Sequence, residues 1–136
     1  MLWILIDIER ELLAFPGTEV LEVVPAIAPQ VVTGCEPPWL GVIQYRGQII
    51  PVLDLCTRLG ISLTRETMRQ RILVVRNRFN HLVGLQVPSA RPAIDDEQET
   101  EFNNNVRKIT RHTSVNQLLD DSHQYSMESF MKGLQV

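Results

Sequence analysis

The chain has 136 residues, a hydrophobic content of 44% and a formal net charge of −3 at pH 7. This length fits one domain with a sizeable core, and the acidic balance argues against a protein held to nucleic acid through phosphate contacts. The longest apolar run near the start, residues 2–6, is followed by Asp7. That run is too short to span a membrane and lacks the layout of a signal peptide, so we expect a cytoplasmic protein.

Two cysteines, Cys35 and Cys56, are too few for a disulfide framework. We expect both to be free thiols that behave as small core residues. Together with His81, His112 and His123 they could supply metal ligands, but no pair has C-x-x-C or H-x-x-x-H spacing. The sequence therefore predicts no metal site and no cofactor.

Signatures of the common enzyme classes are missing from the sequence. It contains no P-loop, no G-x-G-x-x-G and no G-x-S-x-G. Asp54 and Glu22 could form a carboxylate pair, but Asp54 stands between an apolar run and a short helical pattern, which is the position of a helix N-cap. We therefore predict that the protein is not an enzyme.

In chain order, the first elements are apolar runs separated by turn residues. Residues 2–6 and 12–15 are predicted strands, and the second ends at Pro16 and Gly17. Residues 18–24 suit an irregular or helical turn that leads into a strand. Four prolines over residues 25–38 disfavour regular helix there.

A hairpin is predicted inside the stretch from Gly41 to Gly60. The apolar runs 42–43 and 49–53 flank the turn residues 45–48, where Gly47 can adopt a positive φ. The hairpin places the guanidinium of Arg46 at the tip of two apolar strands. Immediately afterwards, Asp54 is the predicted N-cap of a helical turn over 55–59, and Gly60 its stop.

The second half of the chain is predicted less regularly. Residues 61–70 form a polar loop, and residues 71–75 and 81–87 form two strands. Residues 88–105 hold two prolines, several acids and an asparagine run, so we expect a long surface loop.

Residues 41–55 read G-V-I-Q-Y-R-G-Q-I-I-P-V-L-D-L. This stretch resembles the core signature of CheW-like domains, the coupling proteins of bacterial chemotaxis arrays, which is roughly G-V-[IT]-N-L-R-G-x-[IV]-[ILV]-P-[IV]-[VIL]-D-L. Gln44 and Tyr45 replace the usual Asn and Leu. The family's V-x-E-[VI] element matches residues 20–23, and its V-G-[LI]-x-V-D element matches residues 83–87, with Pro88 in place of the Asp.

The resemblance implies a mostly β fold of two small five-stranded β-barrels packed side by side, with short helical turns. We expect residues 1–136 to form a single CheW-like domain, with barrel A over about 12–60 and barrel B over about 1–8 plus 71–136. The family also closes with a hairpin and a short terminal helix. Residues 113–119 and 124–127 fit that hairpin, and residues 128–134 fit the helix.

The resemblance also implies a non-catalytic adaptor that couples the regulatory domain of a CheA-like histidine kinase to the cytoplasmic tip of a chemoreceptor. The pathway stays open between flagellar chemotaxis, twitching motility and surface sensing. Arg46 is the foremost candidate site residue, because a planar fork of five donors suits carboxylates and carbonyls. The full set of candidate partner-binding residues is Val20, Glu22, Leu40, Gly41, Arg46, Ile49 and Pro51.

Two alternatives remain from the residues themselves. One is a small β-barrel that binds nucleic acid or a small ligand on an arginine-rich face, although Phe79 is the only aromatic residue near that face to provide stacking. The other is a regulatory domain that has lost one partner surface. Leu40 bears on the adaptor interpretation as well, since it replaces a polar or basic residue often found there in the family.

Overall fold

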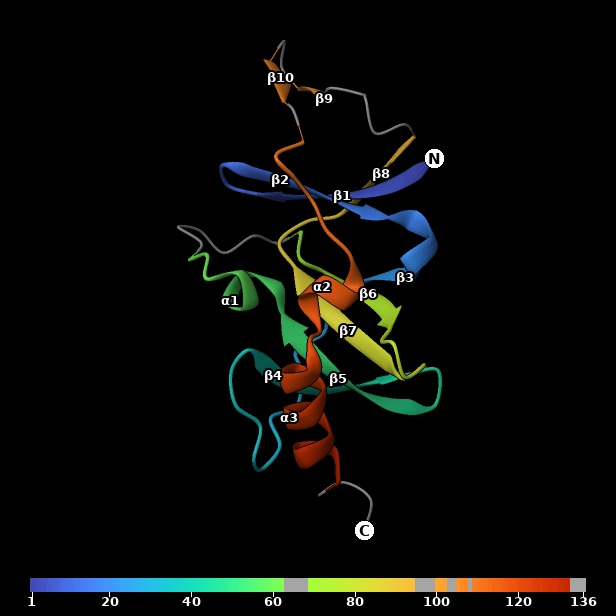
Figure 1. Ribbon diagram of the computed structural model, residues 1–136, viewed down its shortest axis with the longest axis vertical. Coiled ribbons are helices and arrows are strands. Elements are labelled where there is room, and N and C mark those ends of the chain that lie inside the picture. The colour runs from blue at the N-terminus through green and yellow to red at the C-terminus, as the bar shows by residue number, and fades with distance from the viewer. Residues whose placement is uncertain (63–68, 95–99, 103–104, 108, 133–136) are drawn as a thin grey trace.

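The computed structural model describes residues 1–62, 69–94, 100–102, 105–107 and 109–132, and most of its elements are strands (Figure 1). One sheet has the order β3-β6-β7-β5-β4, made of Val20–Pro25, Arg71–Arg76, Leu82–Val87, Gln48–Asp54 and Trp39–Tyr45. A second sheet has the order β11-β2-β1-β8, made of Arg111–His112, Glu11–Pro16, Leu2–Ile8 and Arg91–Ile94. A third pairs β9 (Thr100–Phe102) with β10 (Asn105–Arg107). The mostly β prediction is confirmed.

The inner strands of the two larger sheets are buried on both faces, because successive side chains along them are apolar and point to opposite sides of the sheet. In β6, Ile72 and Val74 point to one face and Leu73 and Val75 to the other, and all four are fully buried. Three hydrophobic clusters result. The sheet cluster is Ile43, Ile50, Val52, Ile72 and Val74, a smaller cluster is Trp3, Leu5, Leu12 and Ala14, and the central core joins the inner faces of both sheets to the helices.

The grouping of strands differs from the predicted division into residues 12–60 and residues 1–8 plus 71–136. β2 pairs with β1 instead of with β4 and β5, through a two-residue turn. β6 and β7 lie in the middle of the five-stranded sheet, between β3 and β5. The physical reason is the burial of apolar surface. A strand that is apolar on both faces buries more of that surface in the centre of a sheet than at its edge.

The β4–β5 hairpin forms as predicted. Tyr45 pairs with Gln48, and the two residues between them, Arg46 and Gly47, have φ values of 46° and 78°. Two successive positive φ values are the geometry of the type I′ turn, which matches the twist of the flanking strands. Arg46 therefore holds a backbone conformation that residues with a side chain adopt at a cost.

The helical turn after the hairpin is α1 (Leu55–Leu59), and Gly60 ends it with a φ of 72°. The predicted cap is only half right. Asp54 occupies the N-cap position but accepts no hydrogen bond from a backbone amide there; its Oδ2 instead accepts from the Thr57 hydroxyl at 2.6 Å. Of the predicted loop that follows, residues 63–68 lie outside the described residues.

Part of the predicted surface loop over residues 88–105 is sheet. β8 pairs with the outer edge of β1, with Ile4 opposite Pro92. An edge strand tolerates proline because one of its sides makes no ladder hydrogen bonds. The predicted loop thus supplies the fourth strand of the second sheet. Residues 95–99 and 103–104 of that loop lie outside the described residues.

The predicted C-terminal hairpin is wrong: α2 (Val115–Leu118) and α3 (Asp121–Met131) occupy this region. Each helix begins at a side-chain cap. Ser114 Oγ accepts from the Gln117 amide at 3.3 Å, and Asp120 Oδ1 accepts from the His123 amide at 3.1 Å. The predicted terminal helix does exist, but it begins at Asp121 instead of Glu128. Figure 1 shows α3 running alongside the five-stranded sheet toward the C-terminus.

Candidate functional site

Three side chains link the two edges of the five-stranded sheet. Glu22 lies on β3, Tyr45 ends β4 and Arg46 follows it in the turn. Arg46 Nη2 lies 3.0 Å from Glu22 Oε2, and the Tyr45 hydroxyl donates to the same oxygen. The Arg46 guanidinium also lies over the Tyr45 ring, with Cζ 5.4 Å from its centroid. We call these three residues the edge cluster, because β3 and β4 are the outer strands of the sheet.

Backbone hydrogen bonds, as well as side chains, bring the β3 and β4 edges of the sheet together. The amides and carbonyls of Gln30 and Val42 exchange two hydrogen bonds of 2.8 and 2.9 Å, which bridge the segment after β3 to β4. Both outer strands also have a register shift, between Val20 and Glu22 in β3 and between Trp39 and Gly41 in β4. Such bulges redirect side chains. The edge cluster therefore sits where the sheet curls back on itself.

The edge cluster is open to solvent on its cationic side. The Arg46 side chain is 74% exposed and that of Glu22 is 36% exposed. An ion pair in such surroundings contributes about 0–1 kcal/mol to folding stability. The hydrogen bond to the Glu22 carboxylate raises the pKa of Tyr45, so the phenol stays protonated and donating at neutral pH. The ion pair therefore adds little to folding stability and leaves the Arg46 guanidinium accessible to solvent.

Two of the predicted site residues turn inward. Val20 is half-buried against the central core, and Leu40 is half-buried against the sheet cluster. Leu40 thus contributes packing where the family often has a polar or basic residue. The second hydrogen bond to the Glu22 carboxylate comes from the Tyr45 hydroxyl, and not from the side chain of residue 40.

Gly41 and Pro51 are buried on neighbouring strands. Gly41 has a φ of 142°, and a Cβ atom there would lie 2.2 Å from the Gln30 carbonyl oxygen. Only glycine permits this approach, so Gly41 shapes the site from within. Ile49, by contrast, is 47% exposed and lines a groove together with Pro51.

Sequence reasoning missed a buried amide pair that holds α3 against the sheet. Asn77 Nδ2 donates to Gln124 Oε1, and both residues are buried. Asn77 Oδ1 accepts from the amides of Phe79 and His81 at 2.9 Å each. The asparagine at the start of the β6–β7 turn was the available signal, since Asn commonly bonds to amides two residues on.

Arg58 and Trp39 also have roles that sequence reasoning missed. Arg58 Nε donates to the Leu118 carbonyl at 2.8 Å, which satisfies the end of α2. Trp39 donates from Nε1 to Ser126 Oγ at 3.0 Å and meets the Phe130 ring edge-on at 5.6 Å. Arg58 thus docks α2 onto α1, and Trp39 docks α3 onto β4.

Both cysteines are free thiols, as predicted, and Cys56 is buried in the central core. Burial raises the pKa of Cys56 to about 11, so the thiol is protonated at neutral pH. Within the described residues, no group of three His, Cys, Asp or Glu side chains could hold a metal ion. Over the same part of the chain, no helix is both long and apolar enough to cross a membrane.

A comparison with family profiles matches residues 2–118 to the CheW-like domain. The chain belongs to the CheW-like domain family. Among solved structures, this CheW-like domain is similar to the scaffolding protein TtCheW from Thermoanaerobacter tengcongensis. The TM-score is 0.64 at 25% identity, over 78% of this chain and 75% of that one. A search of curated protein sequences gave no match. The family match and the likeness to TtCheW support a scaffold or adaptor role in chemotaxis signalling. The residues matched to the family end before α3 begins.

Proposed function

We propose that this CheW-like domain is a non-catalytic adaptor that couples a CheA-like histidine kinase to the cytoplasmic tip of a chemoreceptor-like protein. Family membership and the likeness to a scaffolding protein support the class of function. The single observation that carries the proposal on this chain is the edge cluster. It holds a mostly exposed guanidinium at the tip of a hairpin, and Ile49, the second residue of β5, is exposed close to that tip in the sequence.

The physical argument rests on what a partner would gain at this tip. One nitrogen of the Arg46 fork is engaged by Glu22, which fixes the direction of the side chain. The remaining donors can pair with carbonyl or carboxylate oxygens of a partner. Arginine and tyrosine are enriched in interface hot spots, and the Arg46 guanidinium lies over the Tyr45 ring. Arg46 and Ile49 are the proposed direct contacts.

The other candidate residues are proposed to shape the surface. Glu22 orients Arg46, and Gly41 allows the close approach of the segment after β3. Val20 packs against the central core, Leu40 packs against the sheet cluster, and Pro51 is buried on β5. An adaptor that couples two partners also needs a second binding surface. Since the proposed receptor contact is the cytoplasmic tip, the proposed complex is cytoplasmic.

A reconstitution tests the proposal. The purified domain is mixed with the regulatory domain of a CheA-like kinase and a receptor signalling fragment, each alone and both together, and complexes are separated by size. We expect the kinase domain and the receptor fragment to co-elute only when the adaptor is present, with affinities on the order of micromolar. Binding of neither partner at about a hundredfold higher concentration would reject the adaptor role.

A further inference from the structure

A groove of about 480 Å³ lies between the five-stranded sheet and the C-terminal helix. One wall is the start of β5 and the turn before β7; the other is the last part of α3. The family match ends at residue 118, so one wall belongs to the common fold and the other to a helix outside the match. The groove is therefore formed jointly by the matched part of the chain and by α3, which follows it.

The floor of the groove is apolar and adaptable. Ile49 and Leu82 contribute from the sheet, and Met127 and Met131 contribute from α3. Ile49 is 47% exposed, a large solvent-facing area for an aliphatic side chain on a strand. Methionine side chains have three rotatable bonds and a polarisable sulfur, so they fit apolar groups of different shapes. The floor suits large aliphatic side chains of a partner.

The rim of the groove carries more positive than negative charge. Arg76 stands on the sheet side, Lys132 follows α3 on the other, and His81 lies between Asn80 and Leu82 in the lining. Among the described residues that line the groove, Glu128 is the one carboxylate, and its Oε1 already accepts from Gln124 Nε2 at 3.1 Å. Arg76 gives one nitrogen to the Asn80 carbonyl at 3.2 Å and keeps further donors. On a chain of net charge −3, this is a local cationic rim around an apolar floor.

We infer that this groove binds a protein segment that presents large aliphatic side chains flanked by carboxylates. The aliphatic groups would cover Ile49 and the two methionines, and the carboxylates would meet Arg76 and Lys132 on the two walls. Charge complementarity selects this occupant over a basic segment. Nucleic acid fits less well, because the described residues lining the groove include no Phe, Tyr or Trp on which bases could stack. The inference rests on the proposed function in one respect, since Ile49 and Pro51 are candidate partner contacts.

The test uses the full chain and three labelled peptides in fluorescence anisotropy titrations. The first peptide carries two leucines and two glutamates, the second has lysines for the glutamates, and the third has serines for the leucines. We expect only the first to bind, with an affinity that falls as salt rises. Arg76→Glu with Lys132→Glu should weaken that binding about tenfold or more, as should Ile49→Ser.

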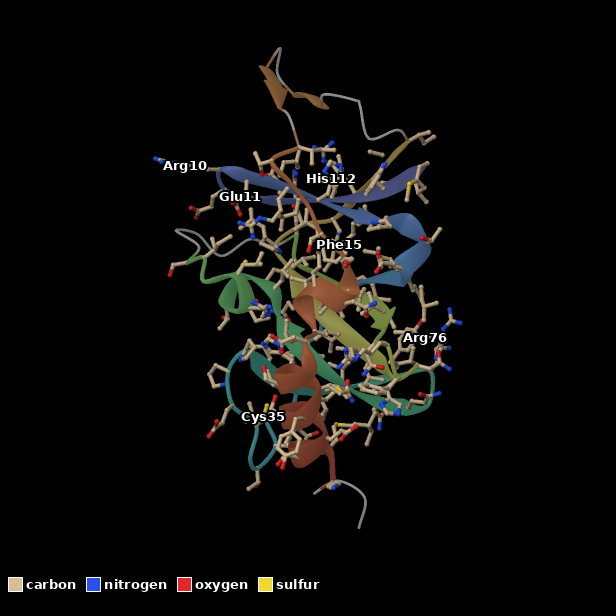
Figure 2. The ribbon with its side chains drawn as sticks, viewed as in Figure 1. Arg10, Glu11, Phe15, Cys35, Arg76 and His112 are labelled. Atoms are coloured by element: carbon tan, nitrogen blue, oxygen red, sulfur yellow. The ribbon has the colours of Figure 1, made fainter. Side chains whose placement is uncertain are left out.

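The matched control is Arg10→Glu, because Arg10 is an exposed arginine on the β1–β2 turn and Figure 2 shows it far from Arg76. This variant should bind the first peptide as the parent does. Equal binding of the lysine peptide, binding that survives the charge reversal, or no binding of any peptide would overturn the inference. Self-association of the chain that Ile49→Ser abolishes would also overturn it, by making a second copy the occupant. Peptide binding without kinase or receptor binding would reject the adaptor role and leave the groove assignment intact.

Discussion

Two turns lie side by side at one end of the five-stranded sheet and are held in opposite ways. β5 and β7 are parallel neighbours, with Val52 opposite Gly84. The β4–β5 turn and the β6–β7 turn, which precede these strands, therefore lie at the same end of the sheet. The β4–β5 turn is tied by the exposed ion pair of Arg46 with Glu22. The β6–β7 turn is tied by the buried amide pair of Asn77 with Gln124.

The difference indicates that the β4–β5 turn serves recognition and that the β6–β7 turn serves stability. An exposed ion pair adds little to folding, but it leaves a charged fork accessible to a partner. A buried amide pair leaves an unsatisfied polar group when either side is removed, and that group costs about 1–3 kcal/mol. We therefore expect substitutions in the β6–β7 turn to change stability, and substitutions in the β4–β5 turn to change binding.

The largest expected loss of stability comes from disturbing the backbone contact between the segment after β3 and β4. Gly41→Ala places a methyl group 2.2 Å from the Gln30 carbonyl oxygen, so the bridge to Val42 must break or shift. We expect a loss of stability on the order of 3 kcal/mol or more in urea unfolding.

The matched control for that substitution is Gly47→Ala. Gly47 also has a positive φ, but a methyl group added there would have no atom of the described residues within 4 Å beyond its chain neighbours. It should cost only about 1–2 kcal/mol of backbone strain. Equal losses in the two variants would show that the close approach at Gly41 does not matter.

The next effect is on the buried amide pair. Asn77→Ala leaves Gln124 without its partner and removes the acceptor for the Phe79 and His81 amides. We expect a loss of about 2–3 kcal/mol, which lowers the melting temperature by roughly 7–10 °C in a chain of this length.

Asn80→Gly is the control in the same turn. Asn80 has a φ of 67°, which glycine adopts without strain, and it bonds to Asn77 and Arg76 through its backbone amide and carbonyl, which glycine keeps. Its melting temperature should stay within about 2 °C of the parent. A fall in Asn80→Gly as large as in Asn77→Ala would mean that the turn conformation, not the amide pair, stabilises this end of the sheet.

A smaller effect concerns the acid stability of α3. Hydrogen bonds from the Ser122 hydroxyl and the His123 amide lower the pKa of Asp120 from 3.8 to about 2. A folded pKa below the unfolded value stabilises the helix above about pH 4, and this contribution is lost as the pH falls toward 2. Fluorescence of Trp39, which contacts Phe130 of α3, follows this loss in a Trp3→Phe background.

Two variants separate the charge of Asp120 from its role as a cap. Asp120→Ala should destabilise α3 by about 1 kcal/mol at neutral pH. Asp120→Asn keeps a good cap without a titrating group, so it should lose most of the fluorescence change between pH 4 and 2. An unchanged acid transition in Asp120→Asn would assign it to other carboxylates.

How far the sequence predicts this molecule depends on how local each feature is. The β4–β5 hairpin was predictable because Gly47 and the flanking β-branched residues act within a few positions of one another, and the end of α1 was predictable because Gly60 directly follows Leu59. The edge cluster was not, since Glu22 and Arg46 are brought together only by the curl of the sheet. Both were candidate site residues, but their pairing has no signal in their spacing.

The prediction for the C-terminal region was wrong for a related reason. Residues 113–131 have few apolar side chains, and their pattern did not separate strand from helix. The helices are decided by the caps at Ser114 and Asp120 and by long-range docking through Arg58 and Asn77. Tertiary contacts of this kind override weak local preferences.

The central claim is that Arg46 serves recognition and not stability, and a paired binding and melting experiment on Arg46→Ala tests it most directly. Arg46→Lys is the control that keeps the charge and the turn but loses the planar fork. The melting temperature of Arg46→Ala should stay within about 3 °C of the parent, while its affinity for the kinase domain or the receptor fragment falls about tenfold or more. If Arg46→Ala unfolds the domain, or binds both partners as the parent does, the turn is only structural and the account is wrong.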